Sequence, residues 1–203
     1  MKIICIGRNY VAHAQELGNQ VPDEPVIFMK PKNALLPTGS SLYYPAFTNE
    51  LHYECELVLK ICKNGKFIPP AYARQYFAEV SLGIDFTARD VQDRLKKKGL
   101  PWEKAKAFDH SAAIGDWVQW RELPDQTNYQ FKLFKNGQQV QNGNTRNMIF
   151  SLEALIADIS EYFTLNIGDL IYTGTPEGVG ECVVGDILEG YLEDEKILEV
   201  EIK

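Results

Sequence analysis

Apolar and polar residues alternate in short runs along most of the chain, a pattern typical of β-strands. Turn dipeptides separate some runs: Asn136-Gly137 predicts a hairpin joining Tyr129–Lys135 to Gln138–Gln141, and Asn64-Gly65 predicts a hairpin turn into Lys66–Ile68. The other expected strands are Lys2–Ile6, Val26–Met29, Tyr53–Ile61, Val80–Phe86 and Ile197–Ile202.

Only two segments have a convincing helical pattern. Ser151–Tyr162 is amphipathic, and its first residue is suited to cap the helix. Ala88–Lys98 also reads as a helix that stops at Gly99. Tyr10–Leu17 could add one or two helical turns. Because strands dominate, we expect a β-rich α+β fold with few helices.

The remaining segments read as connections. Thr38–Asn49 is rich in Pro, Gly, Ser and Thr, so it predicts a loop or an edge strand. Gly168-Asp169 and Gly185-Asp186 each predict a turn that feeds a strand. No linker divides the sequence, and we expect residues 1–203 to form a single catalytic domain.

Composition narrows the class of protein. The chain carries a net charge of -7, and its only dense basic cluster, Lys96–Lys98, falls at a predicted helix end, so we interpret it as solvated and expect no nucleic-acid partner. No apolar run approaches the roughly 20 residues of a membrane-spanning helix. The start, MKIICIGRNY, does not resemble a secretory signal.

The cysteines indicate a reducing compartment. The four cysteines, Cys5, Cys55, Cys62 and Cys182, form no CxxC pair, and three of them lie among apolar neighbours. Buried free thiols are therefore expected rather than disulfides, and cytoplasm is the expected location.

A carboxylate pair is the first candidate for chemistry. Residues two apart on a strand share a face, so Glu54 and Glu56 should lie side by side, with Cys55 on the apolar opposite face. Two adjacent carboxylates repel each other, and a hard divalent cation would relieve that repulsion. Asp85, at the end of an apolar strand, is a candidate third ligand. His52 shares the glutamate face, but we interpret it as structural.

Alternatives stay open at this point. The glutamates could be ordinary exposed residues, and Asp85 or Thr87 could cap the following helix. A non-catalytic protein could use the acidic cluster for calcium or a partner, although the EF-hand pattern is absent. Thr173–Gly180 is glycine-rich but lacks the Gly-Lys-Ser/Thr ending of a phosphate-binding loop.

His13 and Glu16 are three residues apart, so on a helix they would share one face and could hydrogen-bond. Such a carboxylate raises the basicity of the imidazole, which suits a general base. From the residues alone, an exposed polar helical turn is the favoured interpretation. A lysine close to the carboxylates could offset their charge, and Lys104 and Lys106 are equally good candidates.

Five motifs together resemble the fumarylacetoacetate hydrolase family, and within it the small acylpyruvase and oxaloacetate decarboxylase branch. The resemblance implies that family's mixed β-sandwich/roll fold, Mg²⁺ or Mn²⁺ on Glu54, Glu56 and Asp85, and a homodimer. The motifs run in family order over nearly the whole chain: Gly7–Tyr10, His52–Leu57, Asp85–Gln92, Gly99–Trp102 continuing through Lys106, and Thr173–Gly180.

The resemblance also implies roles for individual residues. His13 and Glu16 would be a catalytic pair on a lid, Tyr10–Asp23, whose Gly18, Asn19 and Pro22 fit a mobile segment. It favours Lys106 over Lys104 as the catalytic lysine. The implied substrate contacts are Arg8, Gln92 and Thr175.

These implications converge on a small 2-oxo acid as substrate. A 2-oxo acid can chelate a metal through its C1 carboxylate and C2 oxygen, and the metal would stabilise an enolate. We expect C–C bond hydrolysis of an acylpyruvate or decarboxylation of oxaloacetate. The alternative is an isomerase or tautomerase of an unsaturated 2-oxo diacid, of the 2-hydroxyhepta-2,4-diene-1,7-dioate type.

Overall fold

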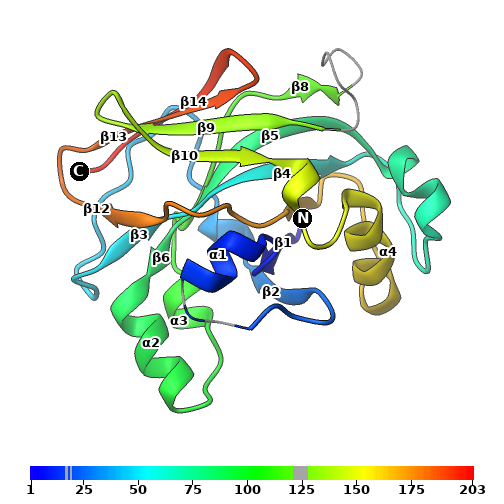
Figure 1. Cartoon of the computed structure of the whole chain (residues 1–203), viewed down its shortest axis with the longest axis horizontal. Helices are drawn as coiled ribbons and strands as arrows, with labels where there is room; N and C mark the ends of the chain where they lie inside the picture. The colour runs from blue at the N-terminus through cyan, green and yellow to red at the C-terminus, as the bar shows by residue number, and fades with distance from the viewer. Residues whose placement is uncertain (17, 19, 121–127) are drawn as a thin grey trace.

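The computed structural model describes residues 1–16, 18, 20–120 and 128–203 (Figure 1). Within these residues the fold is built on one large mixed sheet and two smaller antiparallel ones. The large sheet has the order β2 (Val26–Lys30), β1 (Ile3–Gly7), β11 (Leu170–Tyr172), β4 (Cys55–Ile61), β5 (Phe77–Asp85) and β7 (Ala112–Ile114), with β8 (Val118–Gln119) also paired to β5.

Both faces of the large sheet are covered, which explains why its strands read as nearly continuous apolar runs. Ile4 and Leu57 belong to the main core, whereas their neighbours Ile3 and Val58 belong to a second cluster on the opposite face. The main core is closed by the second sheet, whose order is β10 (Gln138–Asn144), β9 (Gln130–Lys135), β13 (Ile187–Leu192) and β14 (Glu195–Glu201).

The third sheet is short and adjoins the start of β4 and the end of β5. Its order is β12 (Gly180–Cys182), β3 (Leu51–Tyr53) and β6 (Thr87–Ala88). The predicted strand Tyr53–Ile61 is therefore wrong as one unbroken strand. The chain passes from β3 to β4 at Glu54. The segment that pairs with these two strands passes from β5 to β6 across Phe86. This paired break places two candidate carboxylates where the sheets meet.

Helices are few, as predicted, and lie at the margins of the sheets. Figure 1 shows α2 and α3 together at the lower left and α4 at the right. Gly99, with a φ of +63°, follows α2, and Ser151 caps α4 by accepting a hydrogen bond from Ala154 N. The helices are α1 (Val11–Glu16), α2 (Arg89–Lys97), α3 (Glu103–Lys106) and α4 (Leu152–Tyr162), and the 3₁₀ turns are η1 (Lys32–Ala34), η2 (Pro70–Tyr76) and η4 (Thr145–Asn147). No helix in the described part of the chain is long and apolar enough to cross a membrane.

The turn predictions had mixed outcomes. The hairpin at Asn136-Gly137 is confirmed as the β9–β10 connection. The hairpin at Asn64-Gly65 is wrong, because Gly65 pairs with Leu165 from a distant part of the chain and not with the segment that follows it. Leu17 and Asn19, which belong to the predicted lid, lie outside the described residues.

The loop, turn and cysteine predictions agree with the structure. Thr38–Asn49 is largely loop, and the turns at Gly168-Asp169 and Gly185-Asp186 lead into β11 and β13. All four cysteines are free thiols, and all except Cys62 are buried. The β-rich fold class is confirmed.

Candidate active site

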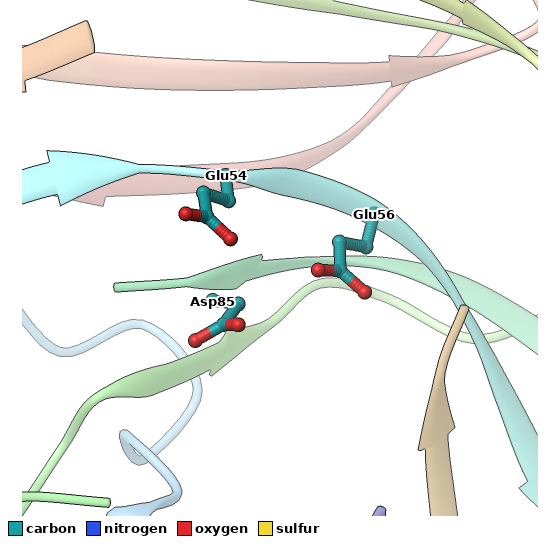
Figure 2. Close-up of side chains that lie close together, drawn as sticks. All are labelled: Glu54, Glu56 and Asp85. Carbon is teal, nitrogen blue, oxygen red and sulfur yellow. The ribbon is translucent and has the colours of Figure 1, made fainter. Parts of the chain in front are cut away.

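Three buried carboxylates meet where the large and the short sheet join. Glu54 lies at the β3–β4 break, Glu56 on β4 and Asp85 at the end of β5, and all three are at least 94% buried. One ligand oxygen from each lies within 4.8 Å of the others. Figure 2 shows the three side chains close together, with Glu54 and Glu56 next to each other along one stretch of chain. Neither Asp85 nor Thr87 caps α2, because the residue at the cap position is Ala88.

Backbone contacts fix this arrangement. Asp85 N donates to Glu54 O at 2.9 Å, which ties the two strand ends together. Gly174 N donates to Glu56 Oε2 at 2.7 Å. Gly174 has a φ of +102°, and a Cβ there would lie 2.7 Å from Asn9 Cβ, so glycine is required at this position. The glycine-rich Thr173–Gly180 loop thus supports a carboxylate.

Two cations neutralise part of the cluster. Lys106 Nζ donates to Glu54 Oε2 at 2.8 Å and to Asp85 Oδ2 at 2.7 Å. Arg89 Nη2 donates to Glu54 Oε1 at 2.6 Å, and its Nη1 donates to Gln92 Oε1 at 2.7 Å. Lys106 rather than Lys104 is therefore the lysine at the carboxylates, since Lys104 is exposed on α3.

Lys30 brings a third cation to the same place. Its side chain is completely buried, and Nζ lies 2.7 Å from Asp85 Oδ1. The same ammonium donates to Ser111 O and Ser111 Oγ, each at 3.0 Å, and to Lys106 O. The ion pair lacks hydrogen-bond geometry, so Asp85 Oδ1 accepts no hydrogen bond from any residue that the structure describes.

The charge state of the carboxylates suits a divalent cation. Burial by itself would raise the pKa of Glu54, but the Lys106 and Arg89 cations outweigh it and hold this pKa well below its usual range. Burial, reinforced by the charges of Asp85 and Glu54, raises the pKa of Glu56 well above its usual range. Glu56 forms no ion pair with the described residues. A divalent cation would give Glu56 the cationic partner that these residues do not provide, and oxygen ligands of this kind suit magnesium or manganese.

The His13 side chain of α1 lies beside this cluster, because it lines the same cavity. His13 is 4% exposed, so the exposed polar turn favoured from the residues alone is wrong for this side chain. His13 Nδ1 lies 3.3 Å from Glu16 Oε2. The other carboxylate oxygen of Glu16 accepts a hydrogen bond from Gly178 N at 3.0 Å, which ties α1 to the Thr173–Gly180 loop.

Thr175 is held by a buried amide from the second sheet. Its Oγ1 donates to Cys55 O at 2.8 Å and accepts from Gln141 Nε2 at 2.9 Å. Gln141 Oε1 in turn accepts from Cys55 N at 2.9 Å. Because Cys55 stands between the two glutamates, this network joins the carboxylate strand to the Thr173–Gly180 loop.

One small cavity joins these groups. Its volume is about 30 Å³, which is room for only about one or two water-sized groups. Glu16 is the only predicted site residue outside its lining. The predicted residues that line it are Arg8, His13, Glu54, Glu56, Asp85, Gln92, Lys106 and Thr175.

A family model described as fumarylacetoacetate (FAA) hydrolase C-terminal matches residues 2–203. The chain belongs to the fumarylacetoacetate hydrolase family. It is 43% identical over 187 residues to oxaloacetate tautomerase FAHD1, mitochondrial, of Bos taurus, covering 92% of this chain and 85% of that protein. It is 41% identical over 188 residues to oxaloacetate tautomerase YcgM of Escherichia coli, covering 92% of this chain and 86% of that protein.

A solved structure with the same fold comes from Pseudomonas aeruginosa. It is fumarylpyruvate hydrolase in complex with Mn²⁺ and pyruvate, with a TM-score of 0.93 and 37% identity over 100% of this chain and 89% of that one. The fumarylacetoacetate hydrolase fold expected from the motifs is therefore confirmed, and the chain is an enzyme of this family.

Sequence analysis did not single out four polar residues of this candidate site, which are Lys30, Arg89, Lys96 and Gln141. Lys30 ends an apolar run and Gln141 follows a hairpin, so neither stands out before the fold is known. Lys96 was interpreted as solvated, which is wrong: it is half-buried and lines the cavity. Burial, followed by the charges of Arg89 and Arg8, lowers the pKa of Lys96. The signal that could have found Lys96 is its spacing of four residues from Gln92 on one helix.

Proposed function

We propose that this enzyme uses Mg²⁺ or Mn²⁺ on Glu54, Glu56 and Asp85 to form the enolate of a small 2-oxo acid. The observation that supports this most is a buried three-carboxylate cluster sharing one cavity with His13. When bound, the divalent ion supplies Lewis acidity that draws negative charge onto the keto oxygen of the substrate.

The cations around the cavity suit an anionic substrate. Arg8, Lys96 and the amide of Gln92 all line it. In our proposal Arg8 and Gln92 hold the C1 carboxylate of the 2-oxo acid, while Lys106 stabilises charge on its keto oxygen. Thr175 is the weakest of the proposed contacts, because its hydroxyl hydrogen is already donated to Cys55 O.

His13 is the proposed proton carrier, and Glu16 orients its ring. In acylpyruvate hydrolysis, His13 would take a proton from the water that attacks C4. The C3–C4 bond then breaks, its electron pair stays on the pyruvate enolate, and protonation at C3 gives pyruvate and a carboxylic acid. In oxaloacetate decarboxylation the same enolate forms when the bond to the departing CO₂ breaks.

Keto–enol tautomerisation is the second candidate, and the names of the two relatives favour it. It needs only the proton transfer: His13 would remove a C3 proton and return it to the enolate oxygen, or the reverse. The same residues serve all three reactions, so an assay with several substrates is needed to decide among them.

The test is a panel assay on the protein stripped of metal by a chelator and then resupplied. Acetylpyruvate, oxaloacetate, its enol form and an unsaturated 2-oxo diacid are each followed with Mg²⁺, Mn²⁺, Ca²⁺ or no metal. We expect turnover of at least one substrate that depends on Mg²⁺ or Mn²⁺. Equal rates with and without metal, or no turnover at all, would contradict the proposal and favour a non-catalytic role.

Three further features are part of the proposal. Residues 1–203 would act as a single catalytic domain, with the Tyr10–Asp23 segment as a lid and two copies forming a homodimer. The cytoplasmic location stays a prediction, since the Bos taurus relative is named as mitochondrial. Sedimentation of the purified chain at micromolar concentration tests the dimer.

A further inference from the structure

Arg8 has an unusual backbone conformation at the point where the chain leaves β1. Its φ is +62°, in the left-handed region that residues with side chains rarely adopt. Four other residues besides glycine have a positive φ in the described part of the chain, but none of them lines the small cavity of the candidate active site, whereas Arg8 does. Conformations of this kind persist where neighbouring contacts hold them, and they are concentrated at functional sites.

The contacts that hold this turn come from Asn9, the next residue. Its side chain is completely buried, and both amide hydrogens are used: Nδ2 donates to Thr173 O at 2.8 Å and to Phe150 O at 3.1 Å. Asn9 Oδ1 accepts from Phe150 N at 2.8 Å, and Asn9 O accepts from Ile149 N at 2.8 Å. Asn9 is therefore attached to two distant parts of the chain, the segment before α4 and the Thr173–Gly180 loop.

The packing around Asn9 is as specific as its hydrogen bonds. A Cβ at Gly174 would lie 2.7 Å from Asn9 Cβ, so the backbone of the loop lies directly against the asparagine. Aspartate has the same shape but no hydrogens to donate to Thr173 O and Phe150 O, and glutamine is one methylene longer. These contacts therefore select asparagine at this position.

The left-handed turn determines where the Arg8 side chain lies. The direction of a side chain follows from the backbone conformation of its residue, so relaxation of Arg8 to an ordinary φ would move its guanidinium. Arg8 is half-buried and forms no ion pair with a described residue, so no such pair holds the guanidinium at the cavity. The position of this positive charge thus depends on the turn that Asn9 holds.

We propose that Asn9 is a positioning residue, which holds Arg8 in the left-handed conformation so that the Arg8 guanidinium stays at the cavity and binds the C1 carboxylate of the 2-oxo acid. The inference rests on the proposed function, because it takes Arg8 as a contact of that carboxylate. Asn9 acts through Arg8, since its own side chain does not line the cavity.

The first experiment measures KM and kcat of Asn9→Ala on a 2-oxo acid that the wild type turns over. KM should rise by about 10–100-fold, the range expected when a hydrogen-bonded contact with a charged group is lost. We expect kcat to stay close to the wild-type value, because the carboxylate contact is equally strong in the bound substrate and in the transition state.

Ser160→Ala on α4 is the matched control for a purely structural effect. Ser160 is also completely buried, and its Oγ accepts from Ile68 N and donates to Ala157 O, each at 2.8 Å. This variant should lower the free energy of unfolding without changing KM. A KM that rises equally in Ser160→Ala and Asn9→Ala would overturn the positioning role.

A double-mutant cycle tests whether Asn9 acts through Arg8. Arg8→Ala should raise KM by a similar factor, and the Asn9→Ala/Arg8→Ala double variant should raise it no further than Arg8→Ala alone. Additive effects of the two changes would overturn the inference. If Asn9→Ala does not fold, Asn9→Ser, which keeps a short hydroxyl donor, takes its place in the cycle with the same expected coupling.

Metal binding separates this role from support of the carboxylates. Asn9 also contacts the loop whose Gly174 N donates to Glu56 Oε2. Electron paramagnetic resonance should give the same Mn²⁺ affinity for Asn9→Ala and the wild type. A fall in Mn²⁺ affinity as large as the fall in substrate affinity would show that Asn9 supports the metal ligands instead, and would overturn the inference.

Pyruvate binding separates the inference from the proposed function. Calorimetry with pyruvate at saturating Mn²⁺ should show the same coupling between Asn9 and Arg8 in Kd. If 2-oxo acids are turned over but neither KM nor Kd shows this coupling, the inference is overturned and the proposed function stands. If pyruvate binding shows the coupling while no 2-oxo acid is turned over, the positioning role stands and the proposed function fails. A wild type that neither binds pyruvate nor turns over a 2-oxo acid would overturn both.

Discussion

Lys106 Nζ lies 2.7 Å from Asp85 Oδ2, inside the ring of carboxylates that we assign to a metal. The same ammonium contacts Glu54 at 2.8 Å, so one lysine bridges two of the three proposed ligands. A metal and this lysine would thus share the same carboxylates. Without the ion, Lys106 supplies part of the charge that keeps these strand ends together.

Replacing Lys106 by Met should destabilise the metal-free protein. It leaves Glu54 and Asp85 without their shared partner, and breaking a buried ion pair costs about 3–5 kcal/mol in free energy of unfolding. Urea denaturation measures the change, with Lys104→Met on the same helix as the exposed control. Mn²⁺ should raise the stability of the Lys106 variant more than that of the wild type. Equal stability of the two variants would show that Lys106 is not a structural counter-charge.

The pair on α1 should contribute to the reaction and not to metal binding. Positioned acid–base groups give about 10²–10⁴-fold in rate, so His13→Ala should lower kcat by that range while the metal still binds. Glu16→Ala should behave similarly, because its carboxylate lies 3.3 Å from the His13 ring, and the double variant should lose little more. Hydrolysis should be reduced more than decarboxylation, since only hydrolysis needs an activated water.

Gln15→Ala, an exposed change on the same helix, is the control for this pair and should keep wild-type kcat. Single-turnover assays on each active substrate, together with metal titrations, provide the measurement. Wild-type kcat in both single variants on every substrate would mean that the pair is not part of the reaction.

Gln141 should act on the metal site without touching it. Its side chain accepts from Cys55 N and donates to Thr175 Oγ1, so Gln141→Leu leaves both groups without that partner. Metal affinity should fall by about 10–100-fold, as expected for groups that hold ligands in place. Gln139→Leu, exposed on the same strand, should change nothing. Unchanged Mn²⁺ affinity in Gln141→Leu would refute this positioning role.

Stability at low pH should depend on Asp169. Burial alone would raise its pKa, but hydrogen bonds from Lys2 and from Asn166 N outweigh burial and lower it. A lowered pKa stabilises the fold above the unfolded value of about 3.9 and ceases to do so as the pH falls through the folded pKa. Asp169→Asn should therefore lower the free energy of unfolding by about 1–3 kcal/mol near pH 7.

The difference in free energy of unfolding between wild type and Asp169→Asn should become smaller below about pH 4, because the wild type loses the same interaction there. Denaturation curves at several pH values measure it, with the exposed Asp194→Asn as control. A difference in free energy of unfolding that stays constant down to pH 2 would show that the ionised Asp169 carboxylate is not the source of this stability.

The local patterns predicted much of the fold and part of the site. Glu54 and Glu56 were identified because strand periodicity alone places them together, and Asp85 because a charged residue ends an apolar strand. Lys30 and Gln141 could not be found this way. Each reaches the site from a different strand, and only the completed sheet arrangement brings them within hydrogen-bonding distance.

The wrong turn has a similar cause. Asn64-Gly65 carries a strong local hairpin signal, yet Gly65 N and O both pair with Leu165, 100 residues further along the chain. The break at Glu54 was also hidden, because the apolar alternation continues unchanged through the point where the chain changes sheets. At Gly65 and at Glu54, backbone pairing with a distant segment of the chain determines the conformation, and the local sequence does not.

We propose that Glu54, Glu56 and Asp85 together bind one divalent ion. The most direct test is a titration of the metal-free protein with Mn²⁺, in which electron paramagnetic resonance reports free Mn²⁺. The wild type and Glu181→Gln, an exposed glutamate on β12, should each bind one equivalent. Glu56→Gln should bind at least about 100-fold more weakly, since even residues that only support ligands cost about 10–100-fold in affinity. Equal Mn²⁺ affinity in all three proteins would show that Glu56 is not a ligand of the ion.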